Sequence, residues 1–299
     1  MAQSIRGRIG FIGLGHMGGP VARHVVASGA EVVVHDVKSE AVAALVDAGA
    51  RCASSPAQVM EDCDIVAVCV VDDDQVREVL AGPAGLLTVA RDGQYVVVHS
   101  TIAPTTIIEL AAQAWKSGVA IVDAPVSGNI EERSSGQLTV FVGGSDEAVE
   151  AVWHYLSMIG MNVEHLGGIG AGLIGKLCNN LMLFCNTLGA FEAVAVAAEF
   201  GIDEDVIVRM AAQGTGGSWV LDNWGWFDKL LIEHPIGDVA AVIDFLQRDL
   251  NYVTETASAQ GRRLQIGAQV AELLRPMFLE RHKRAHGSFA ADDDEERKE

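Results

Sequence analysis

Hydrophobic residues in the first half of the chain gather in short runs, which polar and glycine-rich segments separate. Their length and their content of Val and Ile predict buried strands at residues 8–12, 31–35, 65–71, 95–99, 120–123 and 138–142. Helix-compatible segments alternate with them at residues 20–28, 39–48, 55–61, 74–80, 105–116 and 146–159. Alternation of this kind predicts a doubly wound, mainly parallel sheet with helices on both faces.

The pattern changes after residue 167, where the strand-like runs stop. Residues 172–200 read as one long helix that is apolar on most faces, and further helices are expected at 203–213, 236–259 and 264–284. A helix this apolar should be buried, either between domains or against another subunit. Asn186, Thr187 and Glu192 interrupt it, which favours a buried helix over a membrane span.

We therefore predict an α/β fold with two domains and a tail. An N-terminal doubly wound domain covers residues 1–167, an all-α domain for substrate binding and oligomerisation covers 168–290, and an acidic disordered tail covers 291–299.

A glycine-rich turn joins the first expected strand to the first expected helix. It has the spacing Gly-x-Gly-x-x-Gly and consists of Gly13, Leu14, Gly15, His16, Met17 and Gly18. The first glycine allows a tight turn, the second lets a pyrophosphate approach, and the third lets the helix pack on the strand. The N-terminus of the helix then offers free N–H groups to the phosphates. This context predicts a Rossmann dinucleotide site, the alternative being a glycine turn in some other βαβ unit.

Asp36 ends the second expected strand, about twenty residues after the glycine turn, where a carboxylate can accept hydrogen bonds from a ribose diol. The same carboxylate would repel a 2′-phosphate, so we predict NAD rather than NADP as the cofactor. Lys38 complicates this prediction, because it could partly neutralise an added phosphate.

A second segment, Gly170-Ala171-Gly172-Leu173-Ile174-Gly175, has the same glycine spacing. Together with Lys176 it nearly fits a phosphate-binding loop, but Leu177 stands where that loop needs Ser or Thr. Only the weakly apolar residues 163–166 precede it, so we expect neither kind of nucleotide site here.

Charge and cysteine usage exclude several classes of function. The 299 residues include 21 basic and 40 acidic ones, and the net charge of −19 argues against a nucleic acid or an anionic membrane as partner. The five cysteines have no metal-ligand spacing, so we expect no metal and reduced thiols in a cytoplasmic protein. Arg6 and Arg8 interrupt the N-terminal segment, which therefore lacks the apolar region of a signal peptide.

Lys176 and Asn180 are four residues apart on the long apolar helix and so share one face. Burial would lower the pKa of such a lysine and let it act as an acid or base near neutrality. The pair alone slightly favours a lysine that reaches solvent from the helix start. At another strand end, Ser127, Gly128 and Asn129 could form a nest for an anion or an ordinary Pro/Gly turn.

Several segments together resemble the β-hydroxyacid dehydrogenase family, which includes 3-hydroxyisobutyrate dehydrogenase and tartronate semialdehyde reductase and has 6-phosphogluconate dehydrogenase as a relative. The resemblance covers about residues 7–265, and its motifs lie at 10–18, 100–104, 123–128 with 136–139, and 172–180. It implies that Lys176 is the catalytic residue and that Asn180 assists it, which reverses the interpretation of the pair alone. It further implies that Ser127 and Gly128 hold the substrate carboxylate. Cofactor contacts would come from Val70, Val71 and Thr101.

The chain departs from the family pattern at three positions. Asn129 stands where a second glycine is usual, Arg133 stands at a position that is usually small, and Arg248 replaces a lysine that reaches the cofactor. Arginine keeps that charge but changes its geometry. These departures put the substrate in question more than the type of reaction.

The motifs together predict an NAD-dependent oxidoreductase of a 3-hydroxyacid, or of the corresponding aldehyde acid in reverse. Lys176 would be the general acid/base and a small carboxylate the substrate. One alternative is an imine reductase or a reductase of a bulkier substrate, because Asn129 and the aromatic residues at 216–227 leave the substrate open. Those aromatic residues suit a lid, a subunit contact or core packing. The other alternative is a non-catalytic cofactor-binding module. The apolar helix predicts a homodimer or homotetramer.

Overall fold

The structure is a computed structural model and describes residues 7–233 and 238–286. The chain divides into two compact units between Lys176 and Leu177, which we name the sheet unit and the helical unit. The sequence places its domain limit nearby, at 167, and that limit stays a prediction. The predicted acidic tail lies outside the described residues.

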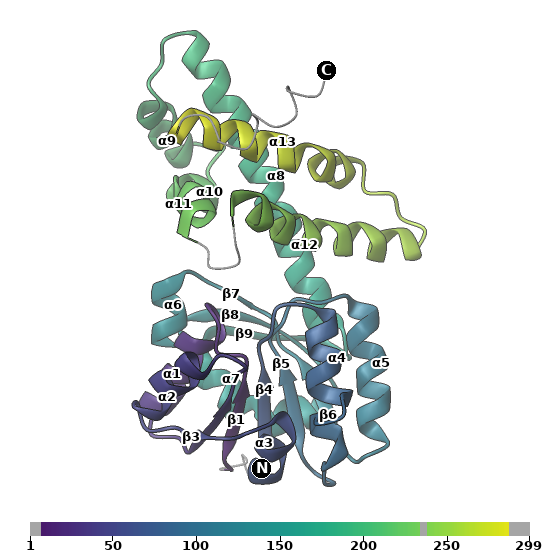
Figure 1. Cartoon of the computed structure of the whole chain (residues 1–299). Coiled ribbons are helices and arrows are strands. Elements are labelled where there is room, and N and C mark those ends of the chain that lie inside the picture. The colour runs from purple at the N-terminus through teal and green to yellow at the C-terminus, as the bar shows by residue number, and fades with distance from the viewer. Residues whose placement is uncertain (1–6, 234–237, 287–299) are drawn as a thin grey trace, which may run out of the picture. The chain divides into compact units, whose positions relative to one another are not determined.

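A single sheet of nine strands forms the centre of the sheet unit within the described residues (Figure 1). The strands are β1 (Ile9–Ile12), β2 (Val32–His35), β3 (Arg51–Cys52), β4 (Ile65–Val68), β5 (Tyr95–Val98), β6 (Ala120–Asp123), β7 (Val126–Ser127), β8 (Leu138–Gly143) and β9 (Gly160–Gly167). Their order is β3-β2-β1-β4-β5-β6-β8-β7, with β9 paired to β8. The six strands from β3 to β6 are parallel, as predicted, while β8 is antiparallel to β6 and β7.

Helices cover both faces of this sheet. They are α1 (Gly18–Ala27), α2 (Ser39–Val46), α3 (Pro56–Asp62), α4 (Asp73–Ala81), η1 (Leu86–Thr88), α5 (Pro104–Trp115), α6 (Ile130–Ser135) and α7 (Asp146–Ile159). Side chains of α1 and α7 fill the core on one face, around Phe11 and Tyr155. Those of α3, α4 and α5 fill the other, around Val66 and Leu80. The strand order reverses between β1 and β4, and in such sheets ligands bind beyond the carboxyl ends of the strands at that point.

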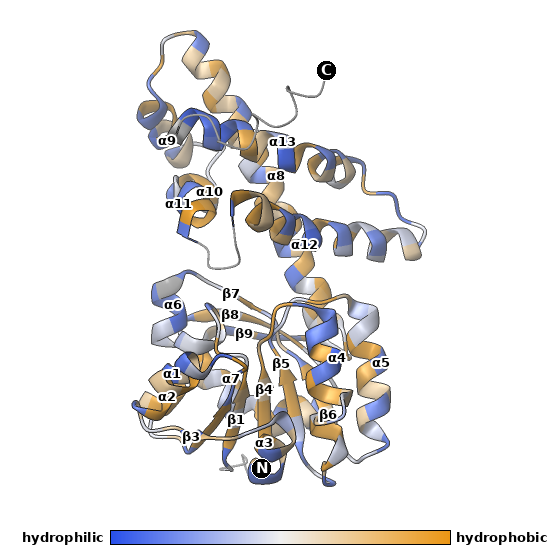
Figure 2. Ribbon diagram, viewed as in Figure 1, coloured by the Kyte–Doolittle hydropathy of each residue, from blue (hydrophilic) through white to orange (hydrophobic). Residues whose placement is uncertain are grey.

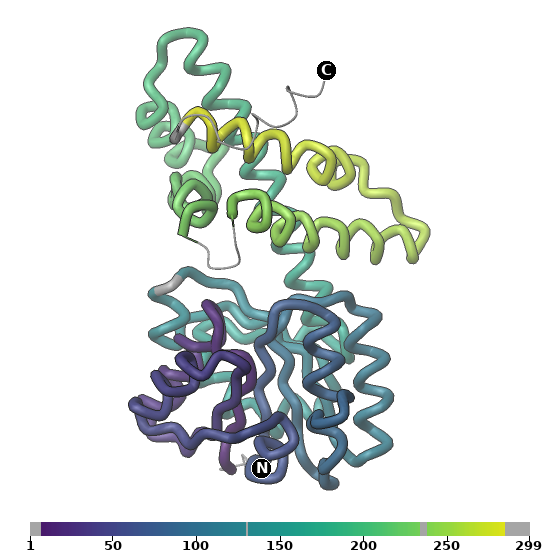
Figure 3. Tube along the Cα trace, in the orientation of Figure 1, coloured from purple at the N-terminus to yellow at the C-terminus, as the bar shows by residue number. Residues whose placement is uncertain are grey.

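The helical unit contains only helices in its described part, which confirms the predicted fold class. The elements are most of α8 (Ala171–Glu199), α9 (Glu204–Gln213), α10 (Trp219–Asp222), α11 (Trp226–Glu233), α12 (Val239–Ala259) and α13 (Gln265–His286). The trace in Figure 3 shows α12 and α13 as an antiparallel pair joined by a short connection. Their apolar sides meet Phe184 and Leu188 of α8 in one core.

Strand β9 corrects the prediction that no strand precedes Gly170. Residues Gly160–Gly167 pair in parallel with β8. Most of their side chains are exposed or half-buried, so this strand lacks the apolar run from which the others were predicted. The elements β3, β7, α6, α10 and α11 were not predicted either. Four of them have six residues or fewer and are too short to show a period, and α11 lies in the segment whose aromatic residues left its structure open.

Helix α8 is only partly buried within one chain, and its predicted burial against another subunit stays a prediction. By length and composition it could cross a membrane, and it is the one such helix in the described chain, yet only 28% of its most apolar window is buried. Figure 2 shows the apolar colouring along it. Ile174, Met182 and Val196 are exposed. A single chain therefore leaves much of this helix accessible.

Candidate functional site

The glycine turn between β1 and α1 is tight on one side and open on the other. Gly13 has φ +90°, and a side chain there would overlap the backbone oxygen of Cys69. A side chain at Gly18 would overlap the carbonyl oxygen of Gly13. Around the Cβ position of Gly15 nothing lies within 4 Å. The outer two glycines are thus needed by the chain itself, whereas the middle one leaves room for a ligand.

The N-terminus of α1 is open to an anion. Met17 at the N-cap makes no side-chain hydrogen bond, and the first turn of the helix holds no acidic residue. The N–H group of Gly19 donates to the carbonyl oxygen of Gly15 at 2.9 Å, and Pro20 has none. The other N–H groups of the turn and the positive end of the helix dipole would be the ones to receive a phosphate.

Asp36 is fixed beside this turn. Its Oδ2 accepts a hydrogen bond from the N–H of Leu14 at 2.6 Å, and its Oδ1 accepts one from the N–H of Lys38 at 2.8 Å. Each carboxylate oxygen keeps a further lone pair, so a ribose diol can still donate to it. This is the position that the sequence predicts for the ribose-binding carboxylate.

Predicted cofactor residues follow the neighbouring strands β4 and β5. The N–H of Val70 donates to Oγ of Ser100 at 2.9 Å, which links the two strand ends and lies next to Val71 and Thr101. Ser100 is buried, and Val71 is exposed. Sequence reasoning used Ser100 only as part of a motif, and the structure gives it this linking contact.

His99 connects the end of β5 to the segment that follows β6. Its Nδ1 donates to the carbonyl oxygen of Ala124 at 2.7 Å, and its Nε2 accepts from the Tyr155 hydroxyl at 2.7 Å. Burial lowers the pKa of His99 to about 4, so the ring is neutral at physiological pH, which suits these two roles. The contact holds Ala124 in place three residues before Ser127.

The Ser127–Asn129 segment leads from β7 into α6. A side chain at Gly128 would press against Leu138 and Glu132, so the turn requires glycine. Asn129 is the N-cap of α6: its Oδ1 accepts from the N–H of Glu132 at 3.0 Å, and Glu132 Oε2 accepts from the N–H of Asn129 at 2.7 Å. This capping box occupies the carboxamide oxygen of Asn129.

Arg133, one turn further along α6, joins this segment to the glycine turn. Its Nε donates to the carbonyl oxygen of Gly128 at 3.2 Å and its Nη1 to that of His16 at 3.4 Å. The sequence predicted both segments as ligand-binding. Their proximity within the sheet unit is a finding of the structure.

Asp123 determines how α8 begins. Its side chain is fully buried and accepts hydrogen bonds from the N–H of Gly170 at 2.7 Å and of Leu173 at 2.8 Å. Burial raises the pKa of Asp123, and these backbone N–H groups offset part of that effect. A carboxylate therefore occupies the N-terminus of α8. This leaves no place for a phosphate and is a better reason against a nucleotide site there than the supposed absence of a strand.

Lys176 follows this start by one turn and is buried, with 9% of its surface exposed. Gly172 and Gly175 let α8 pack closely on the sheet, because side chains there would overlap the carbonyl oxygen of Phe141 and the side chain of Leu166. Asp123 and the two glycines thus fix the position of the lysine in the sheet unit.

Asn180 lies in the helical unit, one helical turn after Lys176. Its Nδ2 donates to Oδ2 of Asp249 at 2.7 Å, and its Oδ1 accepts from Nδ2 of Asn179 at 3.1 Å. Asn180 and Asp249 are both buried. Sequence reasoning named Arg248 and missed Asp249, although an acidic residue among the apolar positions of α12 was a usable signal.

The predicted cofactor residue Arg248 packs on aromatic rings of its own helix. Its guanidinium carbon lies 4.8 Å from the ring centroid of Phe245 and 5.8 Å from that of Tyr252. Nη2 is 3.9 Å from Oδ1 of Asp249. Stacking of this kind is a property of arginine that a lysine would not reproduce.

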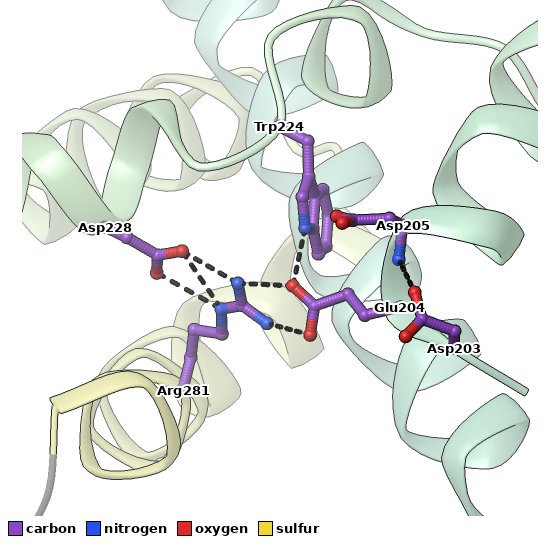
Figure 4. A network of polar contacts seen from close by, with 6 residues as sticks. All are labelled: Asp203, Glu204, Asp205, Trp224, Asp228 and Arg281. Atoms are coloured by element: carbon purple, nitrogen blue, oxygen red, sulfur yellow. Dashed lines mark hydrogen bonds and ion pairs between the residues drawn. The ribbon is translucent and has the colours of Figure 1, made fainter. Parts of the chain in front are cut away.

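The aromatic cluster contributes to the core of the helical unit. Phe227 packs against Phe278 with ring centroids 5.1 Å apart, and Trp226 packs against Phe227 at 4.9 Å. Figure 4 shows Arg281 between the carboxylates of Asp228 and Glu204. The Trp224 indole N–H donates to Glu204 at 2.7 Å in the same network. Core packing, one of the three interpretations of this cluster, therefore accounts for Trp226 and Phe227.

His282 and His286 are four residues apart near the end of α13, the spacing of two metal ligands on one helix face. His282 is buried in the last turns of α13. Its partner at metal-ligand spacing, His286, has a side chain outside the described residues. Across the described chain, no group of three or more His, Cys, Asp or Glu side chains is placed to hold a metal ion.

Comparison with known proteins matches both halves of the chain. Residues 8–167 match the family described as the NAD binding domain of 6-phosphogluconate dehydrogenase. Residues 170–291 match the one described as NAD-binding of NADP-dependent 3-hydroxyisobutyrate dehydrogenase.

Individual relatives extend over most of the chain. The mitochondrial 3-hydroxyisobutyrate dehydrogenase of Bos taurus is 30% identical over 90% of this chain and 81% of its own. The NAD-dependent L-serine dehydrogenase of Pseudomonas aeruginosa is 32% identical over 90% and 91%. Among solved structures, 3-hydroxyisobutyrate dehydrogenase of Salmonella typhimurium is 29% identical with a TM-score of 0.78, covering 90% of this chain and 93% of that one. The chain therefore belongs to the β-hydroxyacid dehydrogenase family and is an NAD(P)-dependent oxidoreductase.

Proposed function

We propose that this protein oxidises a small 3-hydroxyacid with NAD, or reduces the corresponding aldehyde acid with NADH. The observation that carries the proposal is the buried Lys176, placed by Asp123 and followed one turn later by Asn180. A buried amine, followed on the same helix by an amide that Asp249 orients, suits proton transfer to and from a substrate hydroxyl.

The residues of the sheet unit fit a dinucleotide. The open turn at Gly15 and the uncapped start of α1 would bind the pyrophosphate, and Asp36 would bind the adenosine ribose. The rest of the dinucleotide would contact Val70, Val71 and Thr101. A bound NAD would supply the hydride acceptor for the carbon that bears the hydroxyl. The family resemblance implies that Arg248 would contact the cofactor, and its packing on Phe245 would restrict the direction of its guanidinium.

Lys176 carries the proton of the reaction. In the direction of oxidation, the neutral amine takes the hydroxyl proton as the hydride leaves, which yields the carbonyl and an ammonium group. In the direction of reduction, the ammonium group returns the proton to the forming alkoxide. Asn180 is held by Asp249 and would keep the substrate oxygen within reach of the amine.

We place the substrate carboxylate on Ser127 and Gly128. The carboxamide oxygen of Asn129 accepts the capping hydrogen bond of α6, so a contact of Asn129 with the substrate would use its other atoms. The names of two relatives, 3-hydroxyisobutyrate dehydrogenase and L-serine dehydrogenase, support a substrate with a carboxylate and a hydroxyl on carbon 3.

For the cofactor we propose a preference for NAD. Asp36 already accepts two backbone hydrogen bonds that fix its carboxylate, and a 2′-phosphate at the ribose would meet this negative charge. The exposed Lys38 is the group that would weaken the preference.

Steady-state kinetics would test the proposal. The panel contains 3-hydroxyisobutyrate, L-serine and a longer 3-hydroxyacid with NAD or NADP, and a cyclic imine with NADH or NADPH. We expect the highest kcat/KM for a small 3-hydroxyacid with NAD. Turnover of the imine alone would instead support the bulkier-substrate alternative, and equal efficiency with NADP would contradict the role of Asp36.

We also propose that the protein is a homo-oligomer. The exposed apolar side chains Ile174, Met182 and Val196 on α8 support a partner subunit on this helix. Light scattering at micromolar concentration should give the mass of a dimer or tetramer. A stable mass of 31.6 kDa would contradict the proposal.

A further inference from the structure

Arg133 is a buried cation in the sheet unit, with 7% of its surface exposed. It projects from the short helix α6 and donates to the carbonyl oxygens of Gly128 and His16. Burial lowers the pKa of Arg133, although an arginine stays charged at physiological pH.

The partners of this cation do not neutralise it. Both are carbonyl oxygens, and the contact to His16 is long at 3.4 Å. Among the described residues, no carboxylate lies within 4.0 Å of the guanidinium nitrogens as an ion pair. The Glu132 carboxylate accepts the N–H of Asn129 and acts on the guanidinium from farther away, which partly offsets the lowering of the pKa of Arg133 by burial. Burying a charge without an ion-pair partner costs free energy, so a bound anion would stabilise this guanidinium.

The sequence explains why Arg133 reaches the glycine turn. In a helical turn the carbonyl oxygen of His16 would accept from the residue four positions later, which is Pro20 and has no N–H. The guanidinium supplies the missing donor. The positive charge also acts on the turn itself: partial burial and then Arg133 lower the pKa of His16.

We infer that Arg133 is an anion-binding residue of the cofactor site and that it stabilises the dianionic pyrophosphate of a bound dinucleotide. The glycine turn would hold the pyrophosphate by its N–H groups, while Arg133 contributes a positive charge from the side of the turn where the His16 carbonyl lies. This inference rests on the proposed function, because it requires a dinucleotide on the turn.

Three variants at Arg133 and one control test this role. Arg133→Gln and Arg133→Met remove the charge, with Met keeping an unbranched apolar stem should Gln fail to fold. Arg133→Lys keeps the charge. Arg23→Gln is the control, because Arg23 is exposed on α1 and also donates to a carbonyl oxygen, that of Ala44. Thermal melting of each variant identifies those that fold.

The measured quantities are dissociation constants for NADH, ADP-ribose and adenosine, by fluorescence and by displacement. We expect the neutral variants to bind NADH and ADP-ribose about 10- to 100-fold more weakly, the usual size of a contact to a charged group. Adenosine has no phosphate, so its affinity should stay unchanged. The Lys variant should remain within about threefold of the wild type, and Arg23→Gln should have no effect.

Four outcomes would overturn the inference. An equal loss for adenosine would make Arg133 a structural residue of the turn. A Lys variant as weak as Gln would mean that guanidinium geometry, and not charge, is required. Unchanged NADH affinity with a raised KM for the acid would assign the charge to the substrate carboxylate, and unchanged affinity and KM would assign it to neither. A wild-type protein that binds no dinucleotide would instead refute the proposed function itself.

Discussion

The two segments with the spacing Gly-x-Gly-x-x-Gly, at residues 13–18 and 170–175, look equivalent in the sequence and differ in the structure. The first leads into α1, whose N-terminus has no capping side chain, and its middle glycine faces open space. The second leads into α8, where the Asp123 carboxylate accepts two N–H groups and Gly172 packs against backbone.

The difference shows that glycine spacing alone does not define a phosphate site. Glycine permits close approach, and the approaching group can be a ligand or the protein's own sheet. What separates the two cases is the group that the N–H donors at the helix start already hold. At the start of α1 no side-chain carboxylate accepts from these donors, whereas at the start of α8 Asp123 accepts from two of them and thereby positions Lys176.

The largest expected effect comes from the residue that the second turn positions. Lys176→Ala should lower kcat by about a hundred- to ten-thousand-fold, the usual contribution of a general acid–base group. Lys176→Arg should not restore activity, because a guanidinium stays protonated. NADH affinity should be retained, since the first turn, at residues 13–18, would hold the pyrophosphate.

Steady-state kcat and NADH titration of both variants would check this prediction. A near-normal kcat for Lys176→Ala would exclude the lysine as the proton carrier. Lost NADH affinity together with a lower melting temperature would make Lys176 a structural residue. The second turn would then not position a catalytic group.

The sequence predicted the fold class because long apolar strands and their alternation with helices are strong signals. It also predicted the positions of the Gly13–Gly18 turn and of Asp36 at the end of β2. It could not predict β9, whose edge position leaves its side chains half-exposed. Nor could it predict the contacts of Asp123, Arg133 and Asp249, because each joins segments far apart in the chain and depends on the tertiary fold.

A smaller effect is expected from a change at Asp123, whose carboxylate accepts the N–H groups at the start of α8. Asp123→Asn keeps the size of the side chain but offers one acceptor oxygen instead of two. One buried backbone N–H would then face an amide group, at a cost of about 1–3 kcal/mol in the free energy of unfolding. Because α8 begins at this contact and carries Lys176, we also expect kcat to fall about tenfold.

Chemical denaturation and kinetics of Asp123→Asn would check both effects. Asp146→Asn is the matched control: Asp146 lies in the first turn of α7, and its side chain is exposed. The control should change neither quantity. Lost stability with a normal kcat would show that the capping contact supports the fold without positioning the lysine.

Adding one methyl group to each turn is the most direct test of the comparison, with each variant expected to change one quantity and leave the other unchanged. Gly15→Ala meets no atom within 4 Å, so stability should change by less than about 1 kcal/mol while NADH binds about tenfold more weakly, because the methyl group would occupy the path of the pyrophosphate. Gly172→Ala meets the carbonyl oxygen of Phe141 and should do the reverse, lowering stability by about 1–3 kcal/mol with NADH affinity unchanged. Denaturation curves and NADH titrations of the two variants give the four numbers required. If both variants lose the same quantity, the two turns perform one task and the distinction drawn from Asp123 is wrong.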